Sequence, residues 1–245
     1  MTARVGIVGG RGKTGRGVAA ALAVRGAETI AIGRAEWGNL AGALAGCGAA
    51  YVIAPNMHAD EQGYVAEVIA AAQAAGVRRL VFHSVASPYL PEMPHHLGKA
   101  RAEHLVRRSG LAWSILQPGA YLQNFALDGS TVRVAYRADA PFGFADLTDV
   151  AEVAAGVLLD SGHDGATYEL ASFAATVADL ATAAGADVEV VTPEEWARAD
   201  GAGLDVRVRD WLLAMFAYYD RHGLPVGTLP MRVLLGRPPR ALARP

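Results

Sequence analysis

Two kinds of reactive side chain are scarce in this sequence. Its 245 residues contain a single cysteine, Cys47, and its 22 basic residues include only two lysines, Lys13 and Lys99. Cys47 alone cannot form an internal disulfide or a metal site, which is typical of a protein from a reducing compartment, and we interpret it as a small apolar filler. The histidines show no ligand spacing with carboxylates or with Cys47, so we expect no metal ion.

The sequence also lacks an excess of charge and a long apolar run. The formal net charge is −2, whereas nucleic acids and anionic membranes attract proteins with a basic excess, so we expect neither partner. No uncharged apolar run reaches the ~18 residues that a membrane span requires, and no leader pattern precedes the first predicted strand. With 52% apolar and 19% charged residues, the composition predicts a globular protein, and a cytoplasmic location is the expectation.

What the sequence does contain is an alternation of short β-rich runs with longer helical runs. This pattern is typical of repeated βαβ units around a parallel sheet, and the continuous apolar strands fit a sheet that is buried on both faces. Asp60 is expected to cap the second long helix, and Asp146 and Asp149 a later one. The predicted strands are 5–8, 28–32, 51–54, 80–83, 112–117, 167–170 and, more weakly, 188–191, and the predicted helices are 13–25, 60–75, 95–109, 149–159 and 176–184.

A glycine-rich turn, Gly9 to Gly15, follows the first strand and begins the first helix. Gly9 permits the tight turn, Gly12 lets the backbone approach a pyrophosphate, and Gly15 allows close helix packing, while the helix N-terminus stabilises the phosphate charge. A P-loop would need a glycine where the chain has Ile7, and a purely structural turn is the remaining alternative. We therefore predict that a dinucleotide cofactor contacts Gly9, Arg11, Gly12, Lys13, Thr14 and Gly15.

Arg34 follows the second predicted strand, 22 residues after Gly12. An acidic residue near this point accepts the ribose 2′-hydroxyl of NAD, whereas an arginine accommodates the 2′-phosphate of NADP. A guanidinium can bind that phosphate in a bidentate manner, and Arg11 could add a second positive charge. The predicted cofactor is therefore NADP(H). Glu36, two residues later, leaves NAD as the alternative cofactor, and the alternative for Arg34 is a solvated loop residue without a binding role.

The pattern changes after Pro193, where aromatic residues concentrate and 205–222 has the spacing of one amphipathic helix. Trp196 and the aromatic residues within 211–219 are expected to form the core of a small lobe, some of them lining an apolar substrate pocket. The predicted fold class is α/β, a Rossmann-type doubly wound parallel sheet with a small C-terminal lobe. We divide the chain into an NAD(P)-binding domain, 1–171, and a substrate-binding lobe, 172–245, to which 129–142 is a candidate addition.

Several further segments, taken with the glycine turn and Arg34, resemble the NmrA-like branch of atypical short-chain dehydrogenases/reductases over essentially the whole chain. They are Val81–Ala86, Pro94-His95-x-x-x-Lys99 with Glu103, Ser109–Gly119, Asn124, Asp146–Ala151 and Leu235–Arg240. The resemblance implies a Rossmann domain and a C-terminal lobe with a substrate cleft between them. Gln117 departs from the family, in which an arginine commonly precedes the Pro-Gly pair. Family members include quinone and phenylpropanoid-type reductases and also non-catalytic dinucleotide sensors.

Three residues are candidates for catalysis. Standard short-chain reductases place Tyr-x-x-x-Lys on one helix face, but here the spacing is His95-x-x-x-Lys99, without a tyrosine. Histidine can donate a proton near neutral pH, the compact ammonium of Lys99 suits a cofactor ribose hydroxyl, and Tyr121 is an alternative acid. The alternatives are a loop or capping role for His95, a solvated helix face for Lys99 and a packing role for Tyr121.

The remaining predicted cofactor contacts lie where strands end. Ligands bind at the carboxyl edge of an open α/β sheet. Pro55, Ser84 and the Pro118-Gly119 pair each follow or end a predicted strand, so we assign them to the cofactor site together with Lys99.

Three functions are compatible with these residues. The leading hypothesis is an NADPH-dependent reductase of a small apolar or aromatic carbonyl, enone or quinone-like substrate, in which the cofactor performs the hydride chemistry. The alternatives are a non-catalytic NADP(H)-sensing regulatory protein, which the missing tyrosine favours, and a redox-neutral isomerase or cyclase. The expected partner is a small-molecule substrate, and a homodimer is the alternative to a monomer.

Overall fold

A six-stranded parallel sheet organises the first part of the chain. The computed structural model describes residues 2–125, 127 and 131–241, so the domain ends predicted at 1 and 242–245, and 129–130 of the candidate lobe segment, lie outside the described residues. The strand order is β2-β1-β3-β4-β5-β9, and every neighbouring pair is parallel. These strands are β1 (Arg4–Val8), β2 (Glu28–Ile32), β3 (Ala49–Val52), β4 (Arg79–His83), β5 (Ala112–Pro118) and β9 (Ala166–Leu170).

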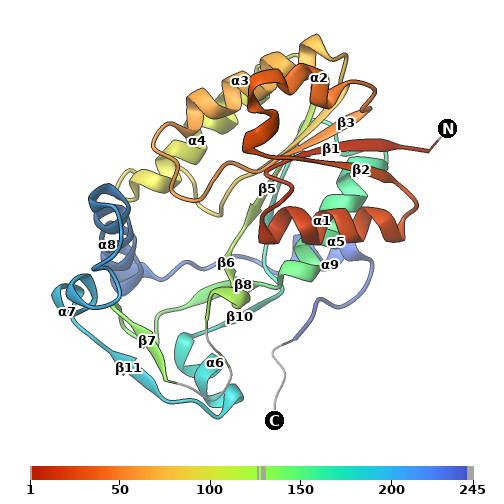
Figure 1. The fold of residues 1–245 in the computed structure, drawn as a ribbon. Coiled ribbons are helices and arrows are strands. Elements are labelled where there is room, and N and C mark those ends of the chain that lie inside the picture. Colours follow the sequence, from red (N-terminus) through yellow and green to blue (C-terminus); the bar gives the residue numbers. More distant parts are fainter. Residues whose placement is uncertain (1, 126, 128–130, 242–245) are drawn as a thin grey trace.

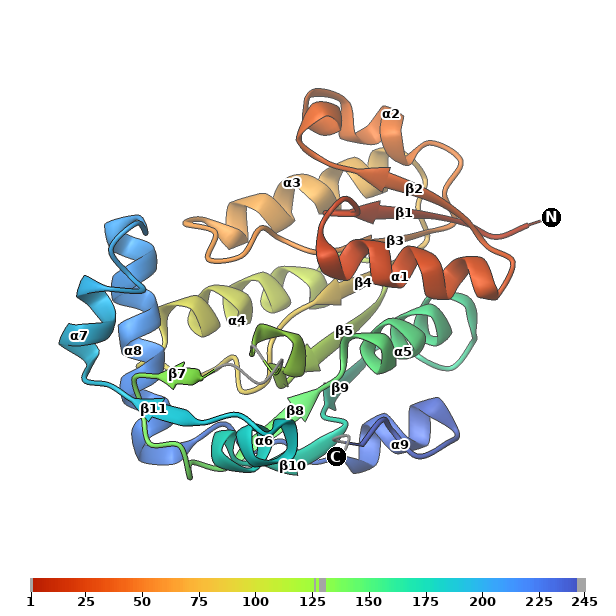
Figure 2. The same ribbon diagram turned by 60° about the horizontal axis from the view of Figure 1, so that its bottom comes forward.

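Helices cover both faces of this sheet (Figures 1 and 2). On one face lie α1 (Lys13–Val24), α5 (Leu147–Leu159) and α9 (Leu229–Leu235), and on the other lie α2 (Leu40–Leu44), α3 (Glu61–Ala74) and α4 (Pro94–Arg107). Successive side chains of β4 therefore enter different cores: Val81 packs under α1 and α5, whereas Leu80 and Phe82 pack under α3 and α4. A strand buried on both faces needs apolar residues at consecutive positions, which explains the unbroken apolar runs in the sequence.

The strand order determines where a ligand site can form. β1 is flanked by β2 on one side and β3 on the other, so the chain reverses its direction of travel across the sheet between β1 and β3. Such a switch point opens a crevice outside the carboxyl ends of the strands. The glycine turn lies there, between β1 and α1.

A second region extends the carboxyl edge of the large sheet (Figure 2). It contains a three-stranded sheet, β10-β8-β6, and a parallel pair of strands, β11-β7. Tyr136, Phe142, Phe144 and Tyr219 pack together at its core. Its elements are β6 (Ala120–Tyr121), β7 (Val132–Val134), β8 (Phe142–Ala145), β10 (Phe173–Ala175), β11 (Val188–Val190), α6 (Val177–Ala184), α7 (Pro193–Arg198) and α8 (Val206–His222). Two short 3-10 helices, η1 (Arg34–Asn39) and η2 (Leu122–Asn124), complete the described elements.

The last helix does not stay with this second region. α9 packs on α5 and β9 of the large sheet, and Met231 is fully buried in the same cluster as Val5. The C-terminal segment thus crosses back to the first part of the chain, and the domain division at 171/172 remains a prediction.

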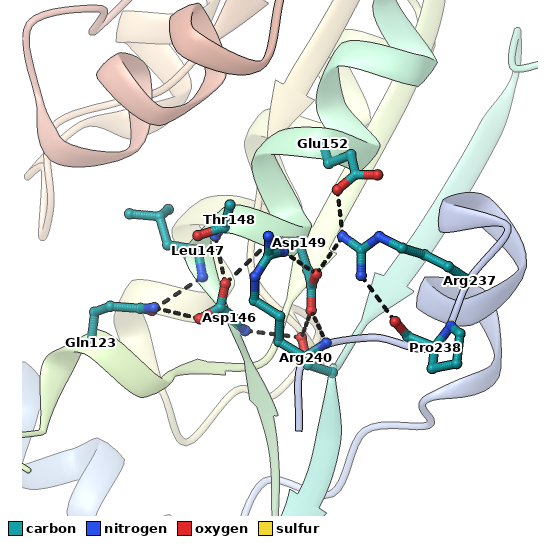
Figure 3. A network of polar contacts seen from close by, with 10 residues as sticks. Gln123, Asp146, Leu147, Thr148, Asp149, Glu152, Arg237, Pro238 and Arg240 are labelled. Carbon is teal, nitrogen blue, oxygen red and sulfur yellow. Dashed lines mark hydrogen bonds and ion pairs between the residues drawn. The ribbon is translucent and has the colours of Figure 1, made fainter. Parts of the chain in front are cut away.

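The structure separates the roles of the two aspartates that were expected to cap the same helix (Figure 3). Asp146 is the N-cap of α5, and its Oδ1 accepts hydrogen bonds from the Thr148 and Asp149 amides. The Asp149 carboxylate does not cap the helix. It is buried and binds the Ser172 hydroxyl and the chain around Arg240 instead. The capping prediction is therefore right for Asp146 and wrong for Asp149, which lies inside the first turn and faces the C-terminal segment.

Candidate functional site

A cavity of about 1770 Å³ lies at the carboxyl edge of the large sheet and continues into the second region. Its walls come from both parts of the chain, which is where the family resemblance places a cleft. All the predicted site residues line it: Gly9, Arg11, Gly12, Lys13, Thr14, Gly15, Arg34, Pro55, Ser84, His95, Lys99, Pro118, Gly119 and Tyr121. Residues from far apart in the sequence thus share one site.

The glycine turn has the form that a pyrophosphate cradle requires. Gly9 has φ +82°, and a Cβ there would lie 2.5 Å from the Ile53 carbonyl oxygen. A Cβ on Gly15 would lie 2.5 Å from the Cα of Gly10, so the start of α1 packs directly on the turn. Gly12 is the N-cap of α1, and no side chain caps the helix there. The first-turn amides are therefore available to an anion, and the residues present fit a dinucleotide.

Two arginines at the edge of the cavity differ in their engagement. Arg11 donates to Glu36 at 2.5 Å, and Glu36 also accepts the Gly33 amide at 2.8 Å. The Gly33 N–H, followed by the Arg11 guanidinium, lowers the pKa of Glu36. Arg34 is exposed, and among the described residues it forms no ion pair or side-chain hydrogen bond. Arg34 is thus available to a phosphate, whereas Glu36 is already occupied.

The Lys13 side chain lines the cavity and contacts the backbone of η2. Its Nζ donates to the Gln123 carbonyl oxygen at 3.0 Å, and the Gln123 side chain in turn binds Asp146 at 2.8 Å and the Leu147 amide at 3.1 Å (Figure 3). Lys13 therefore ties the glycine turn to η2 and to the start of α5.

Lys99 is buried against an acidic partner that the sequence did not reveal. Its Nζ lies 2.6 Å from Glu61 Oε1 and donates to the His83 carbonyl oxygen at 3.1 Å. Both side chains are more than nine-tenths buried, and burial raises the pKa of Glu61 although the ammonium opposes this. The solvated-face alternative for Lys99 does not match this environment. Glu61 could have been suspected, because it follows the Asp60 cap at the start of α3 on the same sheet edge.

A second buried carboxylate, Glu103, organises the end of β4 and β5. Its Oε1 accepts the Ser84 hydroxyl at 2.6 Å and the Gln117 amide at 2.7 Å, while Arg107 pairs with Oε2 at 2.8 Å. The neutral Gln117 therefore has a definite hydrogen-bond partner, the Glu103 carboxylate. Because the Ser84 hydroxyl donates its proton to Glu103, the Ser84 oxygen can act toward the cavity only as a hydrogen-bond acceptor.

A third group surrounds His83, and of its members the sequence indicated only Tyr121. The Tyr51 hydroxyl lies 2.6 Å from His83 Nδ1, and the Tyr121 hydroxyl lies 3.2 Å from Nε2. Burial, followed by the charge of Lys99, lowers the pKa of His83 to about 3. Burial raises the pKa of Tyr121, so at neutral pH the histidine is neutral and the phenol is protonated. The available signal was the position of His83 as the last residue of β4, directly before Ser84.

The environment of His95 does not favour a protonated imidazole. It is buried at the start of α4, its ring stacks on Trp211 at 6.4 Å, and its Nδ1 has no hydrogen-bond partner among the described residues. Burial, Lys99 and His96 lower the pKa of His95 to about 3. At neutral pH His95 is therefore a neutral imidazole, and its assignment as the acid stays a prediction that this pKa disfavours.

The wall contributed by the second region is apolar and aromatic, and residues from 193 onward contribute to it as predicted. Its described members include Phe125, Val134, Tyr136, Phe142, Trp196, Leu212, Met215, Phe216, Tyr219 and Leu224. Such a surface suits a flat, apolar ligand.

Two further properties concern the described residues only. They contain no group of three or more histidine, cysteine, aspartate or glutamate side chains placed to hold a metal ion. No helix in the described ranges has the length and apolar character needed to cross a membrane.

Comparison with known proteins places this geometry in a family. Residues 35–161 match a family described as NAD(P)H-binding. The chain is 30% identical over 239 residues to NAD(P)H azoreductase of Xenophilus azovorans, which covers 91% of this chain and 82% of that protein. It is 28% identical over 240 residues to quinone oxidoreductase 2 of Escherichia coli strain K12, covering 89% and 82%.

The fold matches as well. The crystal structure of an NADPH-dependent quinone oxidoreductase from Escherichia coli, complexed with NADPH, superimposes with a TM-score of 0.81 at 24% identity, covering 98% of this chain and 97% of that one. The predicted Rossmann-type fold and NAD(P)(H) as cofactor are therefore confirmed, and the relatives support an oxidoreductase. The chain belongs to the NAD(P)H-binding family.

Proposed function

We propose that this protein is an NADPH-dependent reductase of a small, flat, apolar acceptor of the quinone or enone type. One observation carries the proposal: the glycine turn, the unpaired Arg34, the Tyr121 hydroxyl and an aromatic wall all line the same cavity. A nucleotide bound along the turn and an apolar acceptor held by the second region would therefore meet beside Tyr121. The curated relatives include reductases of azo compounds and quinones, which share flat conjugated acceptors.

The residues that would hold the cofactor follow from the geometry above. The amides of the turn around Gly12 would bind the pyrophosphate, and Arg34 would bind the 2′-phosphate, because its guanidinium pairs with no carboxylate within the described part of the chain. Glu36 is a poor partner for the 2′-hydroxyl of NAD, since Arg11 and the Gly33 amide already use its oxygens. Lys99 would contact the ribose hydroxyls. The chemistry that bound NADPH would supply here is a hydride for the acceptor.

The acceptor also needs one proton on the oxygen or nitrogen that gains charge. Lys99 is held by Glu61 and by the His83 carbonyl oxygen, and His95 is a neutral imidazole at neutral pH. Tyr121 is protonated there and lines the cavity, so it is the proton donor in this proposal.

The test is a fluorescence titration, followed by turnover. The four tryptophans report binding of NADPH, NADP⁺, NADH and NAD⁺ to the wild-type protein and to Arg34→Ala. The matched control is Arg101→Ala, an exposed arginine of α4 outside the cavity. We expect Arg34→Ala to weaken NADPH binding at least about tenfold, or ~1.4 kcal/mol, with NADH and the control unaffected. Quinone and enone acceptors are then screened by the loss of reduced-nicotinamide absorbance.

The outcomes separate the alternatives. Equal binding of all four nucleotides, insensitive to Arg34→Ala, would refute the assignment of Arg34. Tight NADPH binding that no acceptor ever oxidises would refute the reductase and favour an NADP(H) sensor. Conversion of a substrate without net consumption of NADPH would identify an isomerase or cyclase.

A further inference from the structure

Three aromatic side chains form a hydrogen-bonded row that leads from the protein interior to the cavity. Tyr51 is fully buried, and its hydroxyl lies 2.6 Å from His83 Nδ1. On the opposite side of the imidazole, Nε2 lies 3.2 Å from the hydroxyl of Tyr121, whose ring is parallel to that of His83 within 6°. Only Tyr121 of the two tyrosines lines the cavity.

The direction of these hydrogen bonds follows from counting donors. A neutral imidazole carries one N–H, and each phenol carries one O–H, so the row holds three protons for two internal bonds. Within the described part of the chain, the Tyr51 hydroxyl has no other acceptor than His83 Nδ1. If Nδ1 carried the proton, the Tyr51 O–H would be left in the core without an acceptor, which is the costly arrangement.

The opposite tautomer satisfies every buried donor. With the proton on Nε2, the Tyr51 O–H donates to Nδ1, and Nε2–H donates to the Tyr121 oxygen. The Tyr121 O–H is then the surplus donor, and it is the one that the cavity can accommodate. An imidazolium is excluded for the same reason as the Nδ1–H form, and burial together with Lys99 disfavours it as well.

We infer that Tyr51 fixes His83 as the Nε2–H tautomer, so that Tyr121 must direct its own hydroxyl proton into the cavity. Tyr51 and His83 are thus positioning residues for the proton donor. The consequence for turnover rests on the proposed reductase function, whereas the tautomer itself does not. Because Nε2–H points at the Tyr121 oxygen, it also stabilises the phenolate that forms when Tyr121 gives its proton to the acceptor.

The row does not act as a proton wire from the interior. Passing a proton from Tyr51 through His83 to Tyr121 would leave a phenolate on Tyr51, and burial raises the pKa of Tyr51 far above that of a solvated phenol. Tyr121 therefore recovers its proton from water in the cavity, and the imidazole keeps its tautomer throughout.

Nitrogen NMR of the full-length protein without nucleotide tests the tautomer directly. The protein is labelled with ¹⁵N-histidine, and His83 is assigned from the resonances lost in His83→Gln. We expect a protonated Nε2 and an unprotonated Nδ1 at neutral pH, with Nε2–H favoured about tenfold or more. In Tyr51→Phe, the Nδ1 resonance should move toward that of a nitrogen without a hydrogen-bond donor.

The matched control is Tyr168→Phe. The Tyr168 hydroxyl lies 2.9 Å from Nδ1 of His163, so this variant removes a comparable contact and should leave the His83 resonances unchanged. A protonated Nδ1 in the wild-type protein overturns the inference, and so does an Nδ1 resonance that Tyr51→Phe leaves in place. Should Tyr51→Phe fail to fold, the wild-type spectrum alone decides.

Kinetics supply the second readout. Once an acceptor is found, Tyr121→Phe should lower kcat by about a hundredfold or more. Tyr51→Phe should lower kcat about two- to tenfold, the effect of one neutral hydrogen bond, with NADPH affinity unchanged. An unchanged kcat in Tyr51→Phe refutes the positioning role. Absence of turnover in the wild-type protein refutes the reductase but leaves the NMR result standing.

Discussion

Asp149→Asn tests what holds the C-terminal segment against the large sheet (Figure 3). The Asp149 side chain is fully buried, and its two oxygens accept four hydrogen bonds. Oδ1 accepts Arg237 at 3.0 Å and the Arg240 guanidinium at 2.7 Å, and Oδ2 accepts the Ser172 hydroxyl at 2.9 Å and the Arg240 amide at 2.7 Å. Arg237 pairs in addition with Glu152. Asparagine keeps the shape of the side chain, removes its charge and replaces one of the two acceptor oxygens by an NH2 donor.

The magnitude follows from these contacts. A hydrogen bond to a charged group contributes about 1.5–3 kcal/mol and a neutral one about 0.5–1.5 kcal/mol, so the two bonds to the remaining oxygen each lose roughly 1 kcal/mol. The NH2 group cannot accept a hydrogen bond, so the two donors on its side lose their acceptor. Solvent screening reduces the contribution of the two arginines, whose side chains are 34% and 46% exposed. We therefore expect the free energy of unfolding to fall by about 3–4 kcal/mol, which lowers Tm by roughly 6–16 °C for a chain of this length.

The expected direction of the change in stability agrees with the shift in the pKa of the Asp149 carboxyl group. Burial alone would raise the pKa of Asp149, but the Arg240 amide, the Ser172 hydroxyl and the two guanidinium groups together lower it. A lowered carboxyl pKa contributes stability above the unfolded value of about 3.9 and loses it as pH falls through the folded value. The full contribution is therefore present at pH 7.

Urea denaturation and thermal unfolding at pH 7 measure the effect, and limited proteolysis reports whether the C-terminal segment is released. The control is Asp187→Asn, an exposed aspartate whose side chain has no partner among the described residues. A loss below about 0.5 kcal/mol, equal to that of the control, would mean that the network contributes no net stability and that the reasoning is wrong.

Three further perturbations follow from the site. Gly9→Ala places a Cβ 2.5 Å from the Ile53 carbonyl oxygen at φ +82°, so NADPH affinity in the fluorescence titration should fall more than about tenfold. The control Gly26→Ala, with φ +75° and nothing within 4 Å, should leave that affinity unchanged. Equal NADPH affinities of the Gly9→Ala and Gly26→Ala variants would contradict the steric argument. Lys99→Met leaves the buried Glu61 carboxyl without its cation and should cost about 3–5 kcal/mol in urea denaturation. Adding Glu61→Gln should recover part of this loss, and a double variant no more stable than the single one would argue against the pair. Stability should also fall as pH drops from about 6.5 toward 4, because three buried histidines stay neutral in the folded protein while the unfolded chain takes up protons. They are His83, His95 and His96, whose pKa values burial lowers to about 3, 3 and 4. With up to three protons involved, the slope reaches about 4 kcal/mol per pH unit, and urea midpoints that do not change between pH 6.5 and 5 would contradict these burial effects.

Local sequence signals were enough for the large sheet and the nucleotide turn. Gly9, Gly12 and Gly15 are contiguous with a strand and a helix, so their spacing carries the geometry of the turn by itself. Arg34 likewise follows directly from the end of β2. In the second region the strand at 188–191 was predicted, and the structure has β11 there. The strands β6, β7, β8 and β10 were missed, because strands of two to four residues carry too little periodicity and their pairing comes from distant segments.

Tertiary structure decided which polar groups meet. Tyr51 pairs in register with Val81, so His83 lies two residues farther along β4 on the same face, within reach of the Tyr51 hydroxyl. A register shift of one residue would turn the His83 side chain to the other face, and no property of the sequence near either residue fixes that register. The pairing of Lys99 with Glu61 likewise depends on how α3 and α4 pack. The sequence by itself thus determined the α/β sheet, the glycine turn and the position of a positive charge, Arg34, after the second strand. The orientation of the Tyr121 hydroxyl depends on the alignment of β3, β4 and β6, which is set only when the two regions pack together.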